Sequence, residues 1–199
     1  MHEPVYRKLL PSEKVKVREH FLRLEKEDRR LRFFGQVGDA FIESYCSKIL
    51  VTDYAVLGCF VDGELRAVGE LCSEVHLWNR AAEVAITVER AFQNLGIGTE
   101  ILQHLIRIAR NRSIETLHLS CLLENTKMQR VARKADGALK FADGEVAARI
   151  NPPWPTYWSL IDEALADGRA ALHIWSLARK HASPRAANDD RKPARKVTA

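Results

Sequence analysis

The stretch Gln93-Asn94-Leu95-Gly96-Ile97-Gly98-Thr99 decides the fold of this 199-residue chain. It follows the strand-like run Glu83 to Val88 and opens a run, Glu100 to Arg112, whose apolar residues recur at helical spacing. A glycine pair at a strand-to-helix turn lets backbone amides approach a bulky anion without interference from Cβ atoms. The helix N-terminus adds unpaired donors and the positive end of a dipole. The stretch therefore predicts a site for a phosphorylated cofactor.

Two common phosphate-binding motifs do not fit this stretch. The dinucleotide fingerprint fails because Ile101 stands where its third glycine is needed, and no Gly-Lys-Ser/Thr follows to make a P-loop. The stretch does match the pattern Q/R-x-x-G-x-G/A, and so resembles the pyrophosphate loop of the GNAT family of N-acetyltransferases. An acidic strand before the loop, a strand after the helix, and Asn125 opening a further helix add to this resemblance.

Composition indicates a soluble globular protein, with 46% hydrophobic and 29% charged residues. No apolar run approaches the roughly 20 residues of a membrane span. The first residues, Met1-His2-Glu3-Pro4, lack the basic and apolar regions of a secretory signal. We therefore expect a cytoplasmic location and no membrane association.

The four cysteines, Cys46, Cys59, Cys72 and Cys121, are far apart, and neither C-x-x-C nor H-E-x-x-H occurs. We expect no metal site, and small buried thiols in a reducing cytosol rather than a redox role. The net charge of +5 is concentrated in the tail from Ser183, where five basic residues and two acidic ones leave +3. The rest of the chain is only mildly basic, so nucleic-acid binding is not expected.

The resemblance covers roughly Val5 to Ile150 and implies an α/β fold. Its mixed, largely antiparallel sheet would splay between the fourth and fifth strands and be flanked by helices. We expect a GNAT domain over residues 1–150, a C-terminal helical extension over 151–182 whose first residues are proline-rich, and a basic disordered tail over 183–199. The apolar residues of the added C-terminal helix need a partner surface, either the domain itself or a second chain in a homodimer.

The same resemblance assigns a cofactor site for acetyl-CoA. Backbone groups of Ile86, Thr87 and Val88 would bind the pantetheine arm in the splay, as an added strand would. Backbone amides from Gln93 through Thr99 would hold the pyrophosphate, and the Thr99 hydroxyl can contribute. Asn125 would contact the arm, cap its helix, or do both. The alternative is a glycine loop selected only for its turn.

Glu83 is the catalytic candidate, because an acceptor amine with a pKa near 10.4 must lose a proton before it attacks a thioester. A carboxylate at the sheet opening can accept that proton directly or through water, and partial burial would make it a better base. GNAT domains of bacterial protein acetyltransferases, which the stretch Leu24 to Phe34 also resembles, have a glutamate at this point. The alternative is a rim carboxylate that only shapes the acceptor pocket.

One departure from the family pattern is the lack of the tyrosine that often acts as general acid, since residues 126–139 contain none. Even so, the chain is interpreted as an enzyme that moves an acetyl group from acetyl-CoA to a primary amine, without a covalent enzyme intermediate. The acceptor, a protein lysine or a small-molecule amine, stays open. Two alternatives are a non-catalytic acetyl-CoA-sensing module and an interaction protein that uses its tail.

Overall fold

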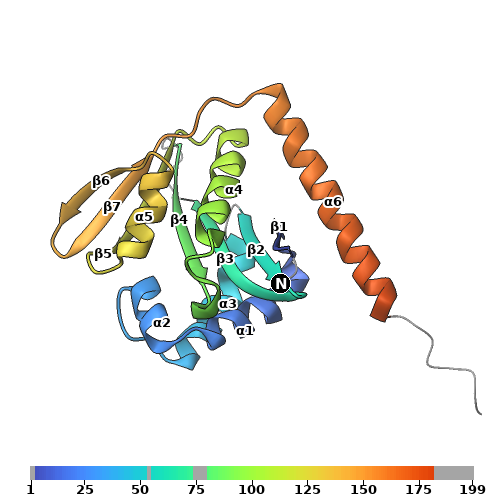
Figure 1. Ribbon diagram of the computed structural model, residues 1–199, viewed down its shortest axis with the longest axis horizontal. Coiled ribbons are helices and arrows are strands. Elements are labelled where there is room, and N and C mark those ends of the chain that lie inside the picture. Colours follow the sequence, from blue (N-terminus) through green and yellow to red (C-terminus); the bar gives the residue numbers. More distant parts are fainter. Residues whose placement is uncertain (1–2, 53–54, 74–79, 182–199) are drawn as a thin grey trace, which may run out of the picture.

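The computed structural model describes residues 3–52, 55–73 and 80–181, and its described strands form one seven-stranded sheet (Figure 1). The order across the sheet is β1-β2-β3-β4-β5-β7-β6. All neighbouring strands are antiparallel except β4 and β5. The strands are β1 (Val5–Lys8), β2 (Ala55–Val61), β3 (Glu64–Ser73), β4 (Ala81–Val88), β5 (Thr116–Leu122), β6 (Ala138–Ala142) and β7 (Glu145–Ile150).

The parallel pair β4 and β5 separates after three residues. Ala81, Ala82 and Glu83 face residues 116–118 of β5, and no pairing follows. β4 continues to Val88 alongside β3 alone, while β5 continues to Leu122 alongside β7 alone. The sheet therefore opens into a V at Glu83. The predicted mixed sheet with a splay between its fourth and fifth strands is confirmed.

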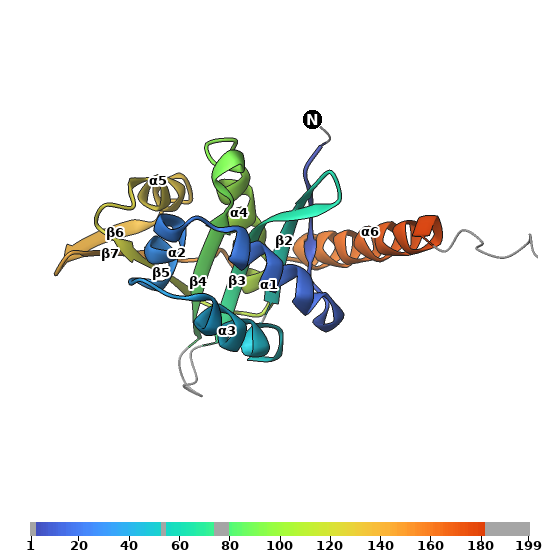
Figure 2. The same ribbon diagram turned by 90° about the horizontal axis from the view of Figure 1, so that it is seen from below.

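Helices cover both faces of the sheet, as Figure 2 shows. On one face, α4 (Ile97–Asn111) and α5 (Thr126–Lys134) enclose the larger apolar core. On the other face, α1 (Lys14–Arg23) and α3 (Asp39–Thr52) enclose a second core. The short helix α2 (Lys26–Phe33) contacts β4 and β5, where the sheet opens, and has no buried residue. Two 3-10 turns, η1 (Pro11–Glu13) and η2 (Arg90–Phe92), precede α1 and follow β4.

Helix α4 begins at Ile97, three residues before the predicted start at Glu100. Its N-cap is Gly96, which has the left-handed φ of 86° that glycine adopts without a Cβ penalty. The helix therefore starts inside the glycine stretch. Helix α4 packs closely against the sheet at Gly69 of β3. A Cβ atom built on Gly69 would lie 2.2 Å from Ile101 Cγ2 of α4, so this close approach requires glycine.

The predicted C-terminal helix is α6 (Tyr157–His181), which extends away from the domain (Figure 1). Polar contacts attach it, since Lys8 Nζ donates to Glu163 at 2.5 Å and Asn111 Nδ2 donates to the same carboxylate at 2.6 Å. The apolar side chains of Trp158, Ile161 and Leu165 are largely exposed. Of the two partner surfaces considered for this helix, the domain itself does not cover these three side chains. Homodimerisation through α6 stays a prediction.

The basic disordered tail predicted over residues 183–199 lies outside the described ranges. Among the helices that the structure does describe, none combines the length and apolar character needed to cross a membrane.

Candidate functional site

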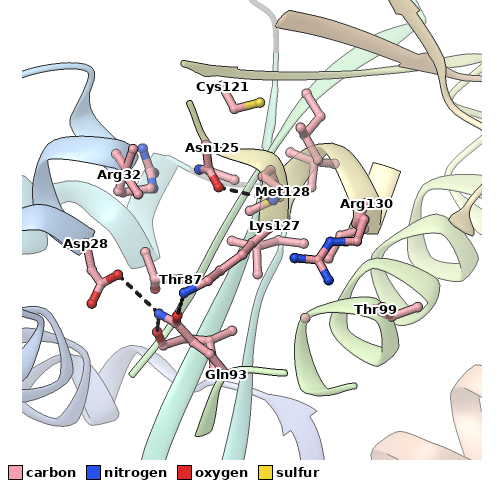
Figure 3. A pocket seen from close by; sticks show the side chains of 18 of the residues that line it. Asp28, Arg32, Thr87, Gln93, Thr99, Cys121, Asn125, Lys127, Met128 and Arg130 are labelled. Atoms are coloured by element: carbon pink, nitrogen blue, oxygen red, sulfur yellow. Dashed lines mark hydrogen bonds between the residues drawn. The ribbon is translucent and has the colours of Figure 1, made fainter. Parts of the chain in front are cut away.

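A cavity of about 250 Å³ occupies the V between β4 and β5 (Figure 3). Most of its lining comes from α2, the open half of β4, the loop of residues 93–99 (the glycine loop), β5 and α5, and Leu24, Phe34, Phe92 and Asn125 complete it. Of the predicted site residues, the cavity brings together Glu83, Ile86, Thr87, Val88, Gln93, Asn94, Gly96, Gly98, Thr99 and Asn125.

The glycine loop presents a run of unpaired backbone donors at one end of this cavity. Among the described residues, no backbone acceptor is bonded to the amides of residues 94–98, whereas Thr99 and Glu100 both donate to the Gly96 carbonyl. Asn94 and Gly96 have positive φ values of 61° and 86°. Alternating left-handed residues turn successive amides toward one point and create a concave anion site, which the dipole of α4 reinforces.

The two glycines of the loop serve different purposes. Gly96 is required by its backbone, because its φ is one that L side chains rarely adopt. A Cβ on Gly98 would meet Val131 Cγ2 at 3.6 Å and Val88 Cγ2 at 3.8 Å, which are ordinary contacts. Both valines line the cavity. The protein itself could accommodate a side chain at position 98, but that side chain would take up cavity space.

Leu95 and Ile97 do not line the cavity with their side chains. Leu95 is 55% exposed, and Ile97 is buried in the larger core. Their predicted role depends on their backbone amides alone, and those amides belong to the unpaired run.

The open edge of β4 offers only some of the predicted backbone contacts. The Glu89 amide donates to the Arg66 carbonyl on β3 at 3.0 Å. Successive residues of a strand direct their backbone groups to opposite sides, so Thr87 also faces β3. Ile86 and Val88 face the edge that β5 has left. The geometry therefore favours Ile86 and Val88 over Thr87 as backbone partners of an extended ligand.

Thr87 contributes instead through a buried side-chain network that the sequence did not reveal. Its hydroxyl lies 2.9 Å from Nε2 of His20 on α1, and His20 Nδ1 lies 3.3 Å from the Glu89 carboxylate. Burial lowers the pKa of His20. In addition, Arg23 Nε donates to the Glu89 carboxylate at 2.9 Å. This network ties α1 to the half of β4 that lines the cavity.

Gln93 links the two walls of the cavity. Its side-chain amide donates to Asp28 on α2 at 3.1 Å and to the Val88 carbonyl at 2.9 Å. Its oxygen accepts from Lys127 Nζ on α5 at 2.5 Å (Figure 3). The first residue of the motif therefore has a structural role through its side chain. Because the Gln93 side chain already donates to the Val88 carbonyl, the Val88 amide is the backbone group of that residue that is left to bind a ligand.

Glu83 lies at the apex of the V, opposite His118 in the last residue pair that β4 and β5 share. It lines the cavity and is exposed. The partial burial considered for this carboxylate is therefore not present. Its position still leaves the carboxylate accessible to a proton donor that enters the cavity.

Asn125 caps α5, since its Oδ1 accepts from the Met128 amide at 3.1 Å, and it also lines the cavity. The capping role is therefore observed, and contact with a ligand stays a prediction. Ser120 and Cys121 of β5 line the same cavity. Burial raises the pKa of Cys121, which favours the protonated thiol.

Sequence reasoning missed the contributions of α2 and α5. Asp28 and Arg32 line the cavity from α2, and Lys127, Arg130 and Lys134 line it from α5. The available signals were the charge-dense segment before Phe33 and the presence of four bases without an acid in α5. Neither signal indicates which of these side chains point into the cavity, because that depends on how each helix is rotated about its axis when it packs.

No cluster of three or more His, Cys, Asp or Glu residues able to hold a metal ion occurs within the described ranges. Cys46, Cys59 and Cys121 are buried, and Cys72 is half-buried.

The open sheet, the anion-binding loop and the cavity between them are the features of the GNAT fold. The model of the acetyltransferase (GNAT) family matches residues 19–137, and the chain belongs to this family. It is similar to the acetyltransferase PA5475 of Pseudomonas aeruginosa, with 27% identity over 117 residues. That match covers 56% of this chain and 62% of the relative, so the chain spans less than two thirds of the relative's length.

Solved structures share the fold. The GNAT domain of S. lividans PAT superposes with a TM-score of 0.64 at 22% identity, covering 73% of this chain and 89% of that domain. The PaiA N-acetyltransferase of Thermoplasma acidophilum, in complex with coenzyme A, gives 0.59 at 18% identity over 75% and 99% of the two chains. The yncA protein of Salmonella typhimurium, with its cofactor acetyl-CoA, gives 0.58 at 12% identity over 78% and 97%.

Proposed function

We propose that this protein transfers an acetyl group from acetyl-CoA to a primary amine, with Glu83 as general base. The observation that carries the proposal is the end of β4–β5 pairing at Glu83, because it opens the cavity and leaves a carboxylate at its apex. A cytoplasmic location and the absence of nucleic-acid binding stay predictions.

The residues fit acetyl-CoA as substrate. The unpaired amides of residues 94–98 suit the pyrophosphate, and the outward-facing backbone of Ile86 and Val88 suits the amide-containing arm. Structures of relatives with coenzyme A or acetyl-CoA support the same ligand.

In this reaction, the step proposed for a side chain of the protein is a proton transfer. The amine nitrogen attacks the thioester carbon, the C–N bond forms and the C–S bond breaks. The Glu83 carboxylate takes the amine proton directly or through water. The departing thiolate can take its proton from solvent, since a thiol pKa near 8.5 makes it a fair leaving group. A tyrosine general acid is therefore helpful but not required.

A non-catalytic acetyl-CoA sensor is the second candidate. It is favoured by one observation, the absence of tyrosine in α5. Release of free thiol from acetyl-CoA with a panel of peptide-lysine and small-molecule amines separates the two functions. Stoichiometric thiol release with any amine supports the enzyme, whereas tight binding of acetyl-CoA without release supports the sensor.

Glu83→Gln tests the proposed base. It keeps the shape and removes the basic carboxylate, so turnover should fall about 10²- to 10⁴-fold while acetyl-CoA affinity stays nearly unchanged. High pH should partly restore the rate, because more of the amine is then deprotonated. Glu145→Gln is the control, since Glu145 is exposed and does not line the cavity. Parallel pH–rate profiles for Glu83→Gln and wild type would limit Glu83 to shaping the pocket.

A further inference from the structure

Arg32 lines the cavity from α2, across from Arg130 of α5 (Figure 3), and a buried network holds its guanidinium in place. Its Nη2 donates to the Tyr45 hydroxyl on α3 at 2.7 Å and to the Glu70 carboxylate on β3 at 3.0 Å. The Tyr45 hydroxyl also donates to Glu70, which is fully buried. The guanidinium lies over the Phe33 ring, 4.9 Å from its centroid. Contacts with α3 and β3 therefore fix the direction of this cation.

This guanidinium has donors that the protein does not use. Arg32 Nε is buried without a hydrogen-bond partner in the described part of the chain, and only Nη2 donates there. A buried donor without an acceptor costs about 1–3 kcal/mol, so such an atom indicates a partner that is still to be supplied. The side chain is 16% exposed and lines the cavity. A ligand in the cavity can therefore reach the guanidinium and supply the acceptor.

Glu83 lies on the same face of the sheet as the carboxylate that anchors Arg32. Strands β3 and β4 pair so that Glu70 faces Ala85, and Glu83 is two residues before Ala85. Side chains two residues apart in a strand point to the same face. Glu70 and Glu83 are therefore diagonal neighbours, with Cα atoms about 7–8 Å apart. Within the described residues, Glu83 forms no ion pair, so the cavity holds a free carboxylate beside a cation with unused donors.

We propose that the acceptor is an amine that also carries a carboxylate, and that Arg32 binds this carboxylate while Glu83 receives the amine. The inference rests on the proposed function and names the substrate class of the same site. A guanidinium has the planar fork of donors that matches a carboxylate, and the charge of Glu83 attracts an ammonium group. Asp28, the other carboxylate of the cavity lining, is already paired with Arg90, which leaves Glu83 for the amine.

The test measures thiol release from acetyl-CoA with matched pairs of acceptors. Glycine, β-alanine, 5-aminopentanoate and Nα-acetyl-lysine each carry a carboxylate, and the carboxamide of each is its neutral partner. Rates are compared at equal concentrations of deprotonated amine, because amidation changes the pKa of the amine. At least one acid should react with a kcat/KM at least 10-fold higher than that of its carboxamide. A peptide that ends in lysine, with a free or an amidated C-terminus, extends the comparison to protein acceptors.

The double variant Arg32→Gln/Glu70→Gln tests the role of the guanidinium. It removes both charges, so Glu70 is not left buried without its partner. The variant should lose the preference for the acid through a higher KM, while kcat/KM for the carboxamide stays within a factor of about three. Arg30→Gln is the matched control, because Arg30 lies on the same helix and does not line the cavity, and it should keep the preference. A purely structural role of Arg32 would lower the rates with both acceptors alike.

Carboxamides that react as well as their acids with the wild type would overturn the inference and leave the proposed function intact. So would thiol release only with amines that lack a carboxylate, or a double variant that keeps the preference or weakens both acceptors equally. Failure of every amine to release thiol would instead refute the proposed function itself. The wild-type comparison needs no substitution, so the test does not depend on how well a variant folds.

Discussion

Gly98→Ala should stabilise the free protein and weaken its binding of acetyl-CoA. The new Cβ would lie 3.6 Å from Val131 Cγ2 and 3.8 Å from Val88 Cγ2, so the folded protein accommodates it without strain. Alanine is favoured over glycine within a helix by about 0.5–1 kcal/mol, and position 98 belongs to the first turn of α4. For a chain of this size, that gain corresponds to a rise in Tm of about 1–4 °C.

The same methyl group occupies cavity space beside the unpaired amides. We expect Gly98→Val, with its larger side chain, to lose at least 10-fold in acetyl-CoA affinity, on the order of 1.4 kcal/mol, and Gly98→Ala to lose less. Stability and affinity therefore change in opposite directions for Gly98→Ala. A ligand at about 100 times its dissociation constant adds roughly 2.7 kcal/mol of stability to the wild type, so thermal melts with and without acetyl-CoA report both quantities.

Gly168→Ala is the matched control. Gly168 lies within α6, and a Cβ there would meet nothing within 4 Å. This substitution should raise stability for the same helical reason and leave acetyl-CoA affinity unchanged. If both Gly98 variants bind acetyl-CoA as tightly as the wild type does, the loop is not the pyrophosphate site.

Three further results are expected. Gly69→Ala should destabilise the fold by about 1–3 kcal/mol, because its Cβ would lie 2.2 Å from Ile101 Cγ2; a stability unchanged in urea would contradict the close packing. Burial raises the pKa of Glu13, but hydrogen bonds led by that from Arg7 outweigh it and lower the pKa to about 2. The resulting stability, about 3 kcal/mol, is present above pH 4.5 and is lost as the pH falls toward 2; Glu13→Gln should flatten this part of the stability profile. A chain ending at Pro155 should melt at a lower temperature than one ending at Ala182, because it lacks the polar contacts of α6; equal melts would show that α6 adds no stability.

The sequence predicted elements whose signals are local. Strand β5 (Thr116–Leu122) alternates polar and apolar residues, and the β6–β7 hairpin turns at the turn dipeptide Asp143-Gly144. The anion-binding loop could also be recognised, because its glycines and the following helix are contiguous in the chain. Periodicity and turn chemistry act over a few residues, and such signals survive in a sequence without its tertiary context.

Other features depended on contacts between distant segments. His20 and Thr87 are hydrogen-bonded although they are 67 residues apart in the sequence, and the local sequence around neither residue indicates this contact. The charges of α5 are visible in the sequence, but the docking of the helix decided that Arg130 faces the cavity and Arg133 does not. The split at Glu83 likewise depends on distant segments, because β5 diverges from β4 after His118 while it stays paired with β7 on its other edge. Side-chain direction and strand divergence follow from how whole elements pack, so only the tertiary structure decided which residues share the site.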